Sequence, residues 1–241
     1  MLELFNGVGV IIDDAFAENE PVDGIWKIKE HLEKRNIPIL TYKKLPPNEQ
    51  IEHFKNICFL LLDWELYGAL PTGISKPETA IDDNIEFIIE FNKVCFAPIF
   101  IFSNESPETI KNILEQKELY NNALNNNHIF VESKSNLKDE GELENKLNEW
   151  LTRTPSIYVL KKWENSLSVA KHNLFWDFYN INPYWPNILK QTFKIDGVDE
   201  NHELSTLIYK NLIARSHPPE FDEDILKEFG DAVAQEDLRK Y

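Results

Sequence analysis

The sequence has few cysteines, a deficit of basic residues and no long apolar run. Its two cysteines, Cys58 and Cys95, both lie in apolar stretches, which predicts reduced, buried thiols rather than a disulfide or a metal pair. The net charge of −16 argues against nucleic acid and anionic membranes as general partners, because both need a basic patch. No apolar run is long enough to span a bilayer, and no signal-peptide pattern opens the chain. These absences predict a cytoplasmic protein without a membrane partner.

The chain contains enough hydrophobic residues to form a hydrophobic core. Of its 241 residues, 42% are hydrophobic and 12% are aromatic, which allows one large domain or two small ones. Strand-like and helix-like segments alternate up to about residue 153, and only helix-like segments follow. We therefore expect two domains, an α/β domain over residues 1–153 and a helical module over residues 154–241.

The stretch from Cys58 to Leu66 reads CFLLLDWEL, an apolar run that ends abruptly on the carboxylate of Asp63. A continuous apolar run of this length is typical of a strand buried on both faces at the centre of a parallel sheet. The end of such a strand faces the crevice in which open α/β sheets bind ligands. Asp63 is therefore either a functional carboxylate or an acidic residue that merely ends the strand.

Four further segments have the composition of short buried strands, and helices with one apolar face lie between them. The strands are predicted at Val8–Ile12, Ile37–Tyr42, Ala97–Phe102 and His128–Glu132. Four of the helices are predicted at Ile25–Arg35, Asn48–Asn56, Asp83–Val94 and Leu143–Leu151. A further helix is predicted to begin at Ser106, with Ser106 as its N-cap and Pro107 in its first turn. A long connection runs from Glu65 to about Asp82. Such alternation predicts a doubly wound α/β fold, a five-stranded parallel sheet covered on both faces.

Polar side chains follow four of the five predicted strands. Asp13 and Asp14 follow the first strand, Asp63 the third, Ser103 the fourth and Lys134 the fifth. Since the carboxyl ends of parallel strands share one edge, these side chains should converge on one crevice. Three clustered carboxylates suit a hard divalent cation such as Mg²⁺, and a hydroxyl and a lysine can hold phosphoryl oxygens.

In this set of residues, over roughly positions 5–153, the chain resembles the receiver domain of two-component response regulators, and within that family the receiver-like domains of prokaryotic conflict (anti-phage) systems. The resemblance implies a flavodoxin-like sheet with strand order 2-1-3-4-5. It implies that Asp13, Asp14, Asp63 and the backbone carbonyl of Glu65 bind Mg²⁺, and that Asp63 accepts the phosphoryl group with help from Ser103 and Lys134. A sensor histidine kinase or phosphotransfer protein would be the donor, so the chain would be a phosphoacceptor in signal transduction and not an enzyme beyond its own phosphorylation and dephosphorylation.

Several positions depart from the family pattern. Ser135 follows the lysine where the family usually has proline, Asn104 follows Ser103 where the family has a small residue, and Val131 stands at the position of the aromatic switch. The alternative is therefore a pseudo-receiver that is not phosphorylated and serves as a protein-interaction module in a signalling or defence assembly. A Mg²⁺ phosphatase of the haloacid-dehalogenase type is disfavoured, because its motif separates two aspartates by one residue, whereas Asp13 and Asp14 are adjacent.

The segment after residue 153 has a helical pattern throughout. Apolar residues recur at steps of four, three, four and four from Trp163 to Phe178, which predicts one long amphipathic helix ended by Asn182-Pro183. Shorter helices are predicted at Tyr184–Phe193, Leu204–Leu212 and Asp224–Phe229. No helix-turn-helix pattern or basic helix is present, so nucleic acid is an unlikely partner. The aromatic residues here form either a core or a surface for a downstream protein partner; they are Trp163, Phe175, Trp176, Tyr184 and Trp185.

Overall fold

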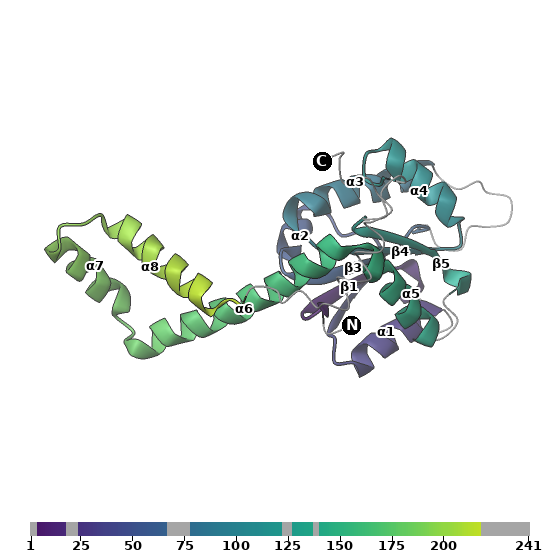
Figure 1. Cartoon of the computed structure of the whole chain (residues 1–241). Coiled ribbons are helices and arrows are strands. Elements are labelled where there is room, and N and C mark those ends of the chain that lie inside the picture. The colour runs from purple at the N-terminus through teal and green to yellow at the C-terminus, as the bar shows by residue number, and fades with distance from the viewer. Residues whose placement is uncertain (1–3, 18–23, 67–77, 122–126, 137–139, 218–241) are drawn as a thin grey trace, which may run out of the picture. The chain divides into compact units, whose positions relative to one another are not determined.

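The computed structural model describes residues 4–17, 24–66, 78–121, 127–136 and 140–217 (Figure 1). The described residues divide into two compact units, separated between Ile157 and Tyr158. The first unit is built on a β-sheet and the second consists of helices.

The sheet of the first unit has five parallel strands in the order β2-β1-β3-β4-β5. The predicted fold class is therefore confirmed, a flavodoxin-like doubly wound α/β sheet followed by a helical module. The strands are β1 (Val8–Ile12), β2 (Ile39–Tyr42), β3 (Ile57–Asp63), β4 (Ile99–Ser103) and β5 (Ile129–Ser133). β3 lies at the centre of the sheet, and all seven of its residues are buried, as its apolar run predicts.

Helices cover both faces of the sheet (Figure 1). The helices α1 (Gly24–Lys34) and α5 (Glu140–Arg153) lie on one face, where Glu144 accepts hydrogen bonds from Arg35 at 2.5 Å and contacts His31 at 3.1 Å. The other face carries α2 (Asn48–Ile51), α3 (Glu78–Val94) and α4 (Pro107–Gln116), whose apolar side chains form one core with β1, β3 and β4. Short 3-10 turns complete the unit: η2 (Asp14–Ala17), η3 (Glu52–Phe54) and η4 (Lys134–Asn136).

Both cysteines are buried thiols, as predicted, and they are not joined in a disulfide. Cys58 lies in β3, and Cys95 follows α3, where its thiol contacts the Ile57 carbonyl oxygen at 3.8 Å. Their burial in the core agrees with a packing role.

Several local predictions differ from the structure, among them the following three. α3 begins at Glu78, five residues before the predicted Asp83, while residues 67–77 of the predicted connection lie outside the described residues. β2 begins at Ile39 instead of Ile37, because Pro38 has no amide to donate to the ladder. Ser106 occupies the N-cap of α4 with Pro107 in the first turn, but its hydroxyl donates to the Glu108 carboxylate at 2.9 Å instead of accepting a backbone amide.

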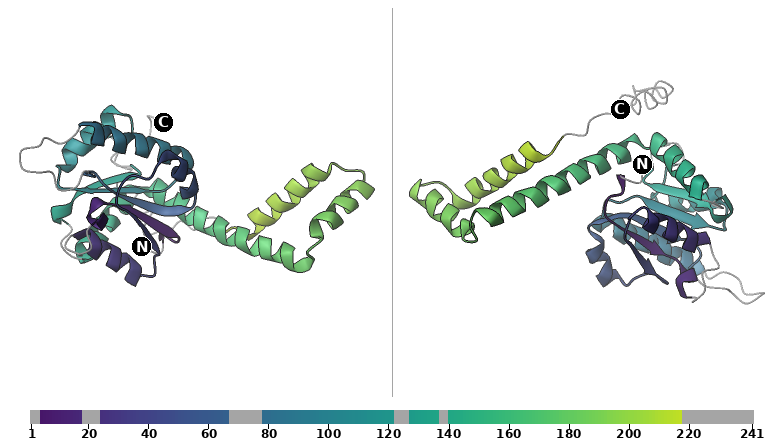
Figure 2. Two further views of the ribbon diagram at one scale, coloured as in Figure 1. Left: turned by 180° about the vertical axis from the view of Figure 1, so that it is seen from behind. Right: turned by 90° about the horizontal axis from the view of Figure 1, so that it is seen from below.

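The second unit, as far as the structure describes it, up to His217, contains one long helix and two shorter ones. The long helix α6 (Pro155–Ile181) starts at the end of the first unit, and α7 (Trp185–Ile195) and α8 (Glu200–Arg215) follow. α8 lies beside α6 (Figure 2), where Ser166 donates a hydrogen bond to the His217 carbonyl at 2.9 Å and Arg215 pairs with Asp177. The predicted helix at Asp224–Phe229 lies outside the described residues. Among the described helices, none has the length and apolarity needed to cross a bilayer.

Candidate functional site

The topology brings polar side chains together at the carboxyl edge of the sheet. Asp13 directly follows β1, Asp63 is the last residue of β3, and Lys134 directly follows β5. β1 and β3 are neighbours in register, so Ile12 lies beside Leu62 and the residues that follow share one edge. A parallel sheet places every such strand end on the same side, which explains the convergence.

Lys134 forms a bridge between two of the carboxylates. Its ammonium nitrogen lies 3.1 Å from Asp13 Oδ2 and 3.0 Å from Asp63 Oδ2. The other oxygen of each carboxylate accepts a backbone amide: Ala15 donates to Asp13 Oδ1 at 2.9 Å and Glu65 donates to Asp63 Oδ1 at 3.1 Å. Both aspartates are almost completely buried, with 1% and 3% exposure, so the pair of negative charges depends on these donors.

The surroundings disfavour the ionised form of the carboxylates of Asp13 and Asp63 and favour the ionised form of Lys134. Burial and the nearby Asp13 charge raise the pKa of Asp63 to about 6, although Lys134 and the Glu65 amide offset part of the rise. Burial also raises the pKa of Asp13 above its ordinary value, against the opposing effect of Lys134. For Lys134, burial alone would lower the pKa, but the charges of Asp63 and Asp13 outweigh it and raise the pKa. The lysine therefore stays protonated, and additional positive charge near the two carboxylates would stabilise their ionised forms.

Asp14, the first residue of η2, completes an acidic group that can hold a metal ion. One carboxylate oxygen each from Asp13, Asp14 and Asp63 lies within 4.8 Å of the others. Carboxylate oxygens suit hard divalent cations, and each carboxylate offers more lone pairs than Lys134 and the backbone amides occupy. The residues present therefore fit a divalent cation. The Glu65 carbonyl as a further ligand stays a prediction.

Ser103 lies at the end of β4, as predicted, and is completely buried. Its hydroxyl oxygen accepts a hydrogen bond from the Glu105 amide at 2.9 Å and can still donate its own proton. The next residue, Asn104, donates its amide to Glu65 Oε2 at 3.3 Å. This contact joins the segment after β3 to the segment after β4 beside the candidate nucleophile Asp63.

The sequence reasoning missed Asn84, a buried polar residue on α3 that supports the site. Its side-chain amide donates to the Trp64 carbonyl at 2.9 Å, which holds the backbone directly after Asp63. Its Oδ1 has no hydrogen-bond partner within the described residues. The signal was available in the sequence, because Asn84 lies three and four residues before the buried Phe87 and Ile88, on the apolar face of a helix.

Comparisons with known proteins identify no family for the chain. No family model matches it, and the search of curated proteins gives no match. One similar solved structure is a fusion that contains a trimeric coiled coil of yeast Spc42, amino acids 181–211. It shares 9% identity with a TM-score of 0.39, over 73% of this chain and 99% of that chain. A likeness at this level supports no inference about fold or function.

Proposed function

We propose that the chain is a response regulator of the two-component type, in which Asp63 accepts a phosphoryl group in a Mg²⁺-dependent reaction. The observation that carries the proposal is the bridge of Lys134 between the buried carboxylates of Asp13 and Asp63, beside the third carboxylate of Asp14. A single lysine fixed to two buried acids at the carboxyl edge of a parallel sheet is a costly arrangement, which a purely structural strand end does not require.

The proposed reaction is a transfer from a phosphohistidine of a sensor histidine kinase or phosphotransfer protein. A carboxylate oxygen of Asp63 attacks phosphorus, the new O–P bond forms, and the N–P bond breaks with its electron pair returning to the donor imidazole. Mg²⁺ bound to Asp13, Asp14 and Asp63 would neutralise charge on the phosphoryl oxygens. Lys134 keeps its contact with Asp13 and pairs with a phosphoryl oxygen, and the Ser103 hydroxyl donates to another.

The helical unit supplies the surface through which the state would reach a partner. On α6, Phe175, Trp176 and Tyr179 are 60%, 53% and 60% exposed. Large aromatic side chains are enriched at protein interfaces and are uncommon in this number on the surface of one helix. A downstream protein partner is the occupant that fits this surface.

Phosphorylation by a small-molecule donor tests the proposal. We expect acetyl phosphate with Mg²⁺ to add the mass of one phosphoryl group to the intact chain, and chelation of Mg²⁺ or the substitution Asp63→Asn to abolish the addition. Beryllofluoride with Mg²⁺ should change the fluorescence of Trp64, which is buried directly beside Asp63. A Trp64→Phe variant identifies this signal among the six tryptophans of the chain.

The alternative function is a metal-binding interaction module that is not phosphorylated. The contact between the Asn104 amide and the Glu65 carboxylate favours it, because this contact places an acidic side chain beside the position of the incoming phosphoryl group. If Mg²⁺ changes Trp64 fluorescence in the wild type but no mass addition occurs with acetyl phosphate or with a histidine phosphotransfer donor, this alternative replaces the first proposal.

A further inference from the structure

Asn84 is a completely buried asparagine on α3, with 0% of its surface exposed. Its neighbours Ile85 and Ile88 belong to the hydrophobic core on this face of the sheet. A buried amide costs free energy unless hydrogen bonds replace those it made with water. Within the described residues, its Nδ2 has a partner and its Oδ1 has none. A leucine of the same shape would avoid this cost, so packing alone does not account for an asparagine at this position.

The partner of Asn84 belongs to the peptide group that contacts Asp63. Asn84 Nδ2 donates to the Trp64 carbonyl at 2.9 Å. The Glu65 amide is the other half of this Trp64–Glu65 peptide group, and it donates to Asp63 Oδ1 at 3.1 Å. A trans peptide group is planar, and its C=O and N–H point in opposite directions. Asn84 and Asp63 therefore hold the two ends of one rigid group, and a rotation that breaks either hydrogen bond also disturbs the other.

This peptide group and Lys134 together orient the Asp63 carboxylate. The Glu65 amide donates to Oδ1, and the Lys134 ammonium nitrogen lies 3.0 Å from Oδ2. With one donor at each oxygen, the plane of the carboxylate is defined, and so are the lone pairs that remain for a cation. Groups that orient a metal ligand commonly change metal affinity by about tenfold or more when they are removed.

A second contact to this segment is weaker. The Asn104 amide donates to Glu65 Oε2 at 3.3 Å in an exposed position, whereas the hydrogen bond from Asn84 is shorter and buried. A hydrogen bond is electrostatically stronger in the interior of a protein than in water. α3 is a helix of 17 residues whose apolar side chains pack in the core, so Asn84 fixes the peptide group to a rigid element.

We propose that Asn84 is a positioning residue, which holds the Asp63 carboxylate in its Mg²⁺-binding orientation through the Trp64–Glu65 peptide group. Asn84 itself touches neither the cation nor the phosphoryl group. The inference deepens the proposed function and rests on it for the steps that involve Mg²⁺ and phosphorus. The hydrogen-bonded link between Asn84 and Asp63 is measurable without either of them.

The first test follows the Glu65 amide proton by NMR in the absence of Mg²⁺ and of any phosphoryl donor. The substitution Asn84→Leu keeps the shape of the side chain and removes its donor. We expect the Glu65 amide proton to move upfield and to exchange with solvent at least about threefold faster, because its hydrogen bond to Asp63 weakens. Asn84→Ala, a smaller side chain, should give the same changes and replaces the leucine variant if that variant does not fold.

An NMR titration with MgCl₂ at constant ionic strength tests the consequence at the site. We expect Asn84→Leu to raise the dissociation constant of Mg²⁺ by about tenfold. The rate of mass addition from acetyl phosphate should fall as well, because the same carboxylate is the proposed acceptor.

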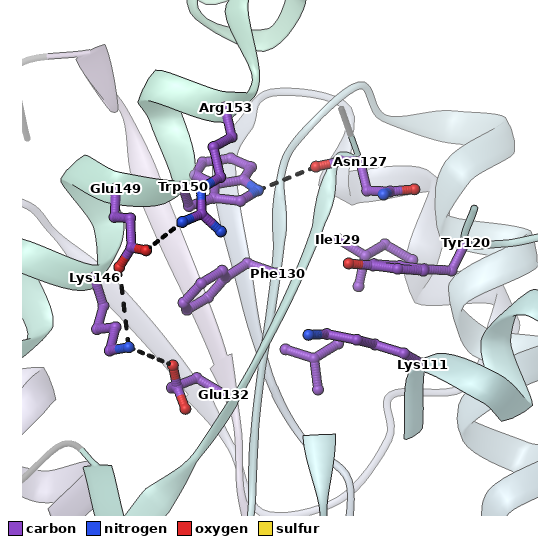
Figure 3. Close-up of a pocket in the computed structure, with 11 residues that line it drawn as sticks. Lys111, Tyr120, Asn127, Ile129, Phe130, Glu132, Lys146, Glu149, Trp150 and Arg153 are labelled. Carbon is purple, nitrogen blue, oxygen red and sulfur yellow. Dashed lines mark hydrogen bonds and ion pairs between the residues drawn. The ribbon is translucent and has the colours of Figure 1, made fainter. Parts of the chain in front are cut away.

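Thr154→Val is the matched control, because it also removes a buried donor to a backbone carbonyl. Thr154 is 0% exposed, and its hydroxyl donates to the Trp150 carbonyl at 2.9 Å. Trp150 lines a pocket of about 270 Å³ beside β5, and neither Asp63 nor Lys134 is among the residues that line this pocket (Figure 3). The control should lose stability in urea denaturation, yet leave the Glu65 amide proton and the Mg²⁺ affinity unchanged.

Two results would overturn the proposal. One is a folded Asn84→Leu variant in which the Glu65 amide proton is unchanged. The other is an equal loss of Mg²⁺ affinity in the Thr154→Val control, which would mean that general destabilisation explains the effect. Failure of the proposed function has a different signature: the wild type shows no mass addition, while the Glu65 amide and the Mg²⁺ affinity still respond to Asn84→Leu, and the positioning role stands.

Discussion

At the scale of single residues, Asp63 shows how the fold places a charge where it is unfavourable. Its pKa is raised by burial to about 6, against about 3.9 for an unfolded aspartate. A raised pKa means that the folded state binds the proton more tightly than the unfolded state does. The corresponding stability is present below about pH 4 and is lost as pH rises through about 6. At neutral pH the ionised side chain therefore destabilises the fold, which is common at functional sites.

The substitution Asp63→Asn should remove this cost. We expect it to raise the free energy of unfolding by on the order of 2 kcal/mol near pH 8, with the gain shrinking to a small fraction by about pH 4 and disappearing below it, where Asp63 is protonated in both states. Urea denaturation across this pH range measures the effect. Asp82→Asn, at an exposed aspartate whose ion pair with Lys117 spans 3.9 Å, is the matched control and should have little effect at any pH. A gain for Asp63→Asn that is equally large at pH 4 would contradict the electrostatic explanation.

Gly9 in β1 is required for a different reason, the close approach of an aromatic ring. A β-carbon at Gly9 would lie 2.3 Å from Cζ of Phe59, a buried residue that packs edge-to-face on Phe5 and Phe100. Gly9→Ala should therefore lower the free energy of unfolding by about 1–3 kcal/mol, measured by chemical denaturation. Gly24→Ala, at the start of α1, adds a β-carbon with no atom within 4 Å and should be neutral or stabilising. If Phe59→Leu fails to relieve any of the Gly9→Ala cost, the clash is not the cause.

At the scale of elements, the sequence pattern predicted the positions of the strands well. It predicted the side-chain contacts at the strand ends less well. Apolar runs bounded by polar residues placed every strand to within two residues, and β1 to the residue, because a strand buried on both faces needs such a run. The convergence of Asp13, Asp63 and Lys134 followed from topology alone. The bridge of Lys134 between the two carboxylates did not, since it depends on side-chain distances.

Other elements carried information that a linear pattern hides. The hydroxyl of Ser106 could cap the helix backbone or bind Glu108, and the sequence favours neither. In the helical unit, a periodic apolar pattern predicted α6 correctly, yet could not tell a buried face from an exposed one.

Two adjacent residues of α6 separate those faces. Leu174 is 2% exposed and Phe175 is 60% exposed. Leu174→Ala should cost about 2–4 kcal/mol of unfolding free energy, because it leaves a cavity, whereas Phe175→Ala should cost less than about 0.5 kcal/mol. Conversely, Phe175→Ala should lower the binding of a hydrophobic dye to the folded chain. Thermal denaturation and dye fluorescence measure the two effects. Equal destabilisation by both substitutions would mean that Phe175 is part of a core and not of a partner surface.

At the scale of the whole molecule, we expect the net charge and the strand-end site to respond to cations in different ways. With 41 acidic and 25 basic residues, the chain repels itself, so any added salt should stabilise it by screening. The acidic group of Asp13, Asp14 and Asp63 should add a response that depends on the identity of the cation, because it offers oxygen ligands within 4.8 Å of one another. The two responses can be separated by matching ionic strength.

We expect about 10 mM MgCl₂ to stabilise the chain by roughly 1.4 kcal/mol more than NaCl of equal ionic strength, if the dissociation constant is about 1 mM. Binding only to the folded state gives this gain, since the unfolded chain separates the three carboxylates. Differential scanning calorimetry should show it as a rise of a few degrees in Tm. Asp14→Asn should abolish the difference between the two salts and preserve the response to NaCl, because it removes one ligand while changing the net charge only slightly. If Mg²⁺ and NaCl stabilise the wild type equally, the strand-end acids bind no specific cation, and the Mg²⁺-dependent step at Asp63 fails with them.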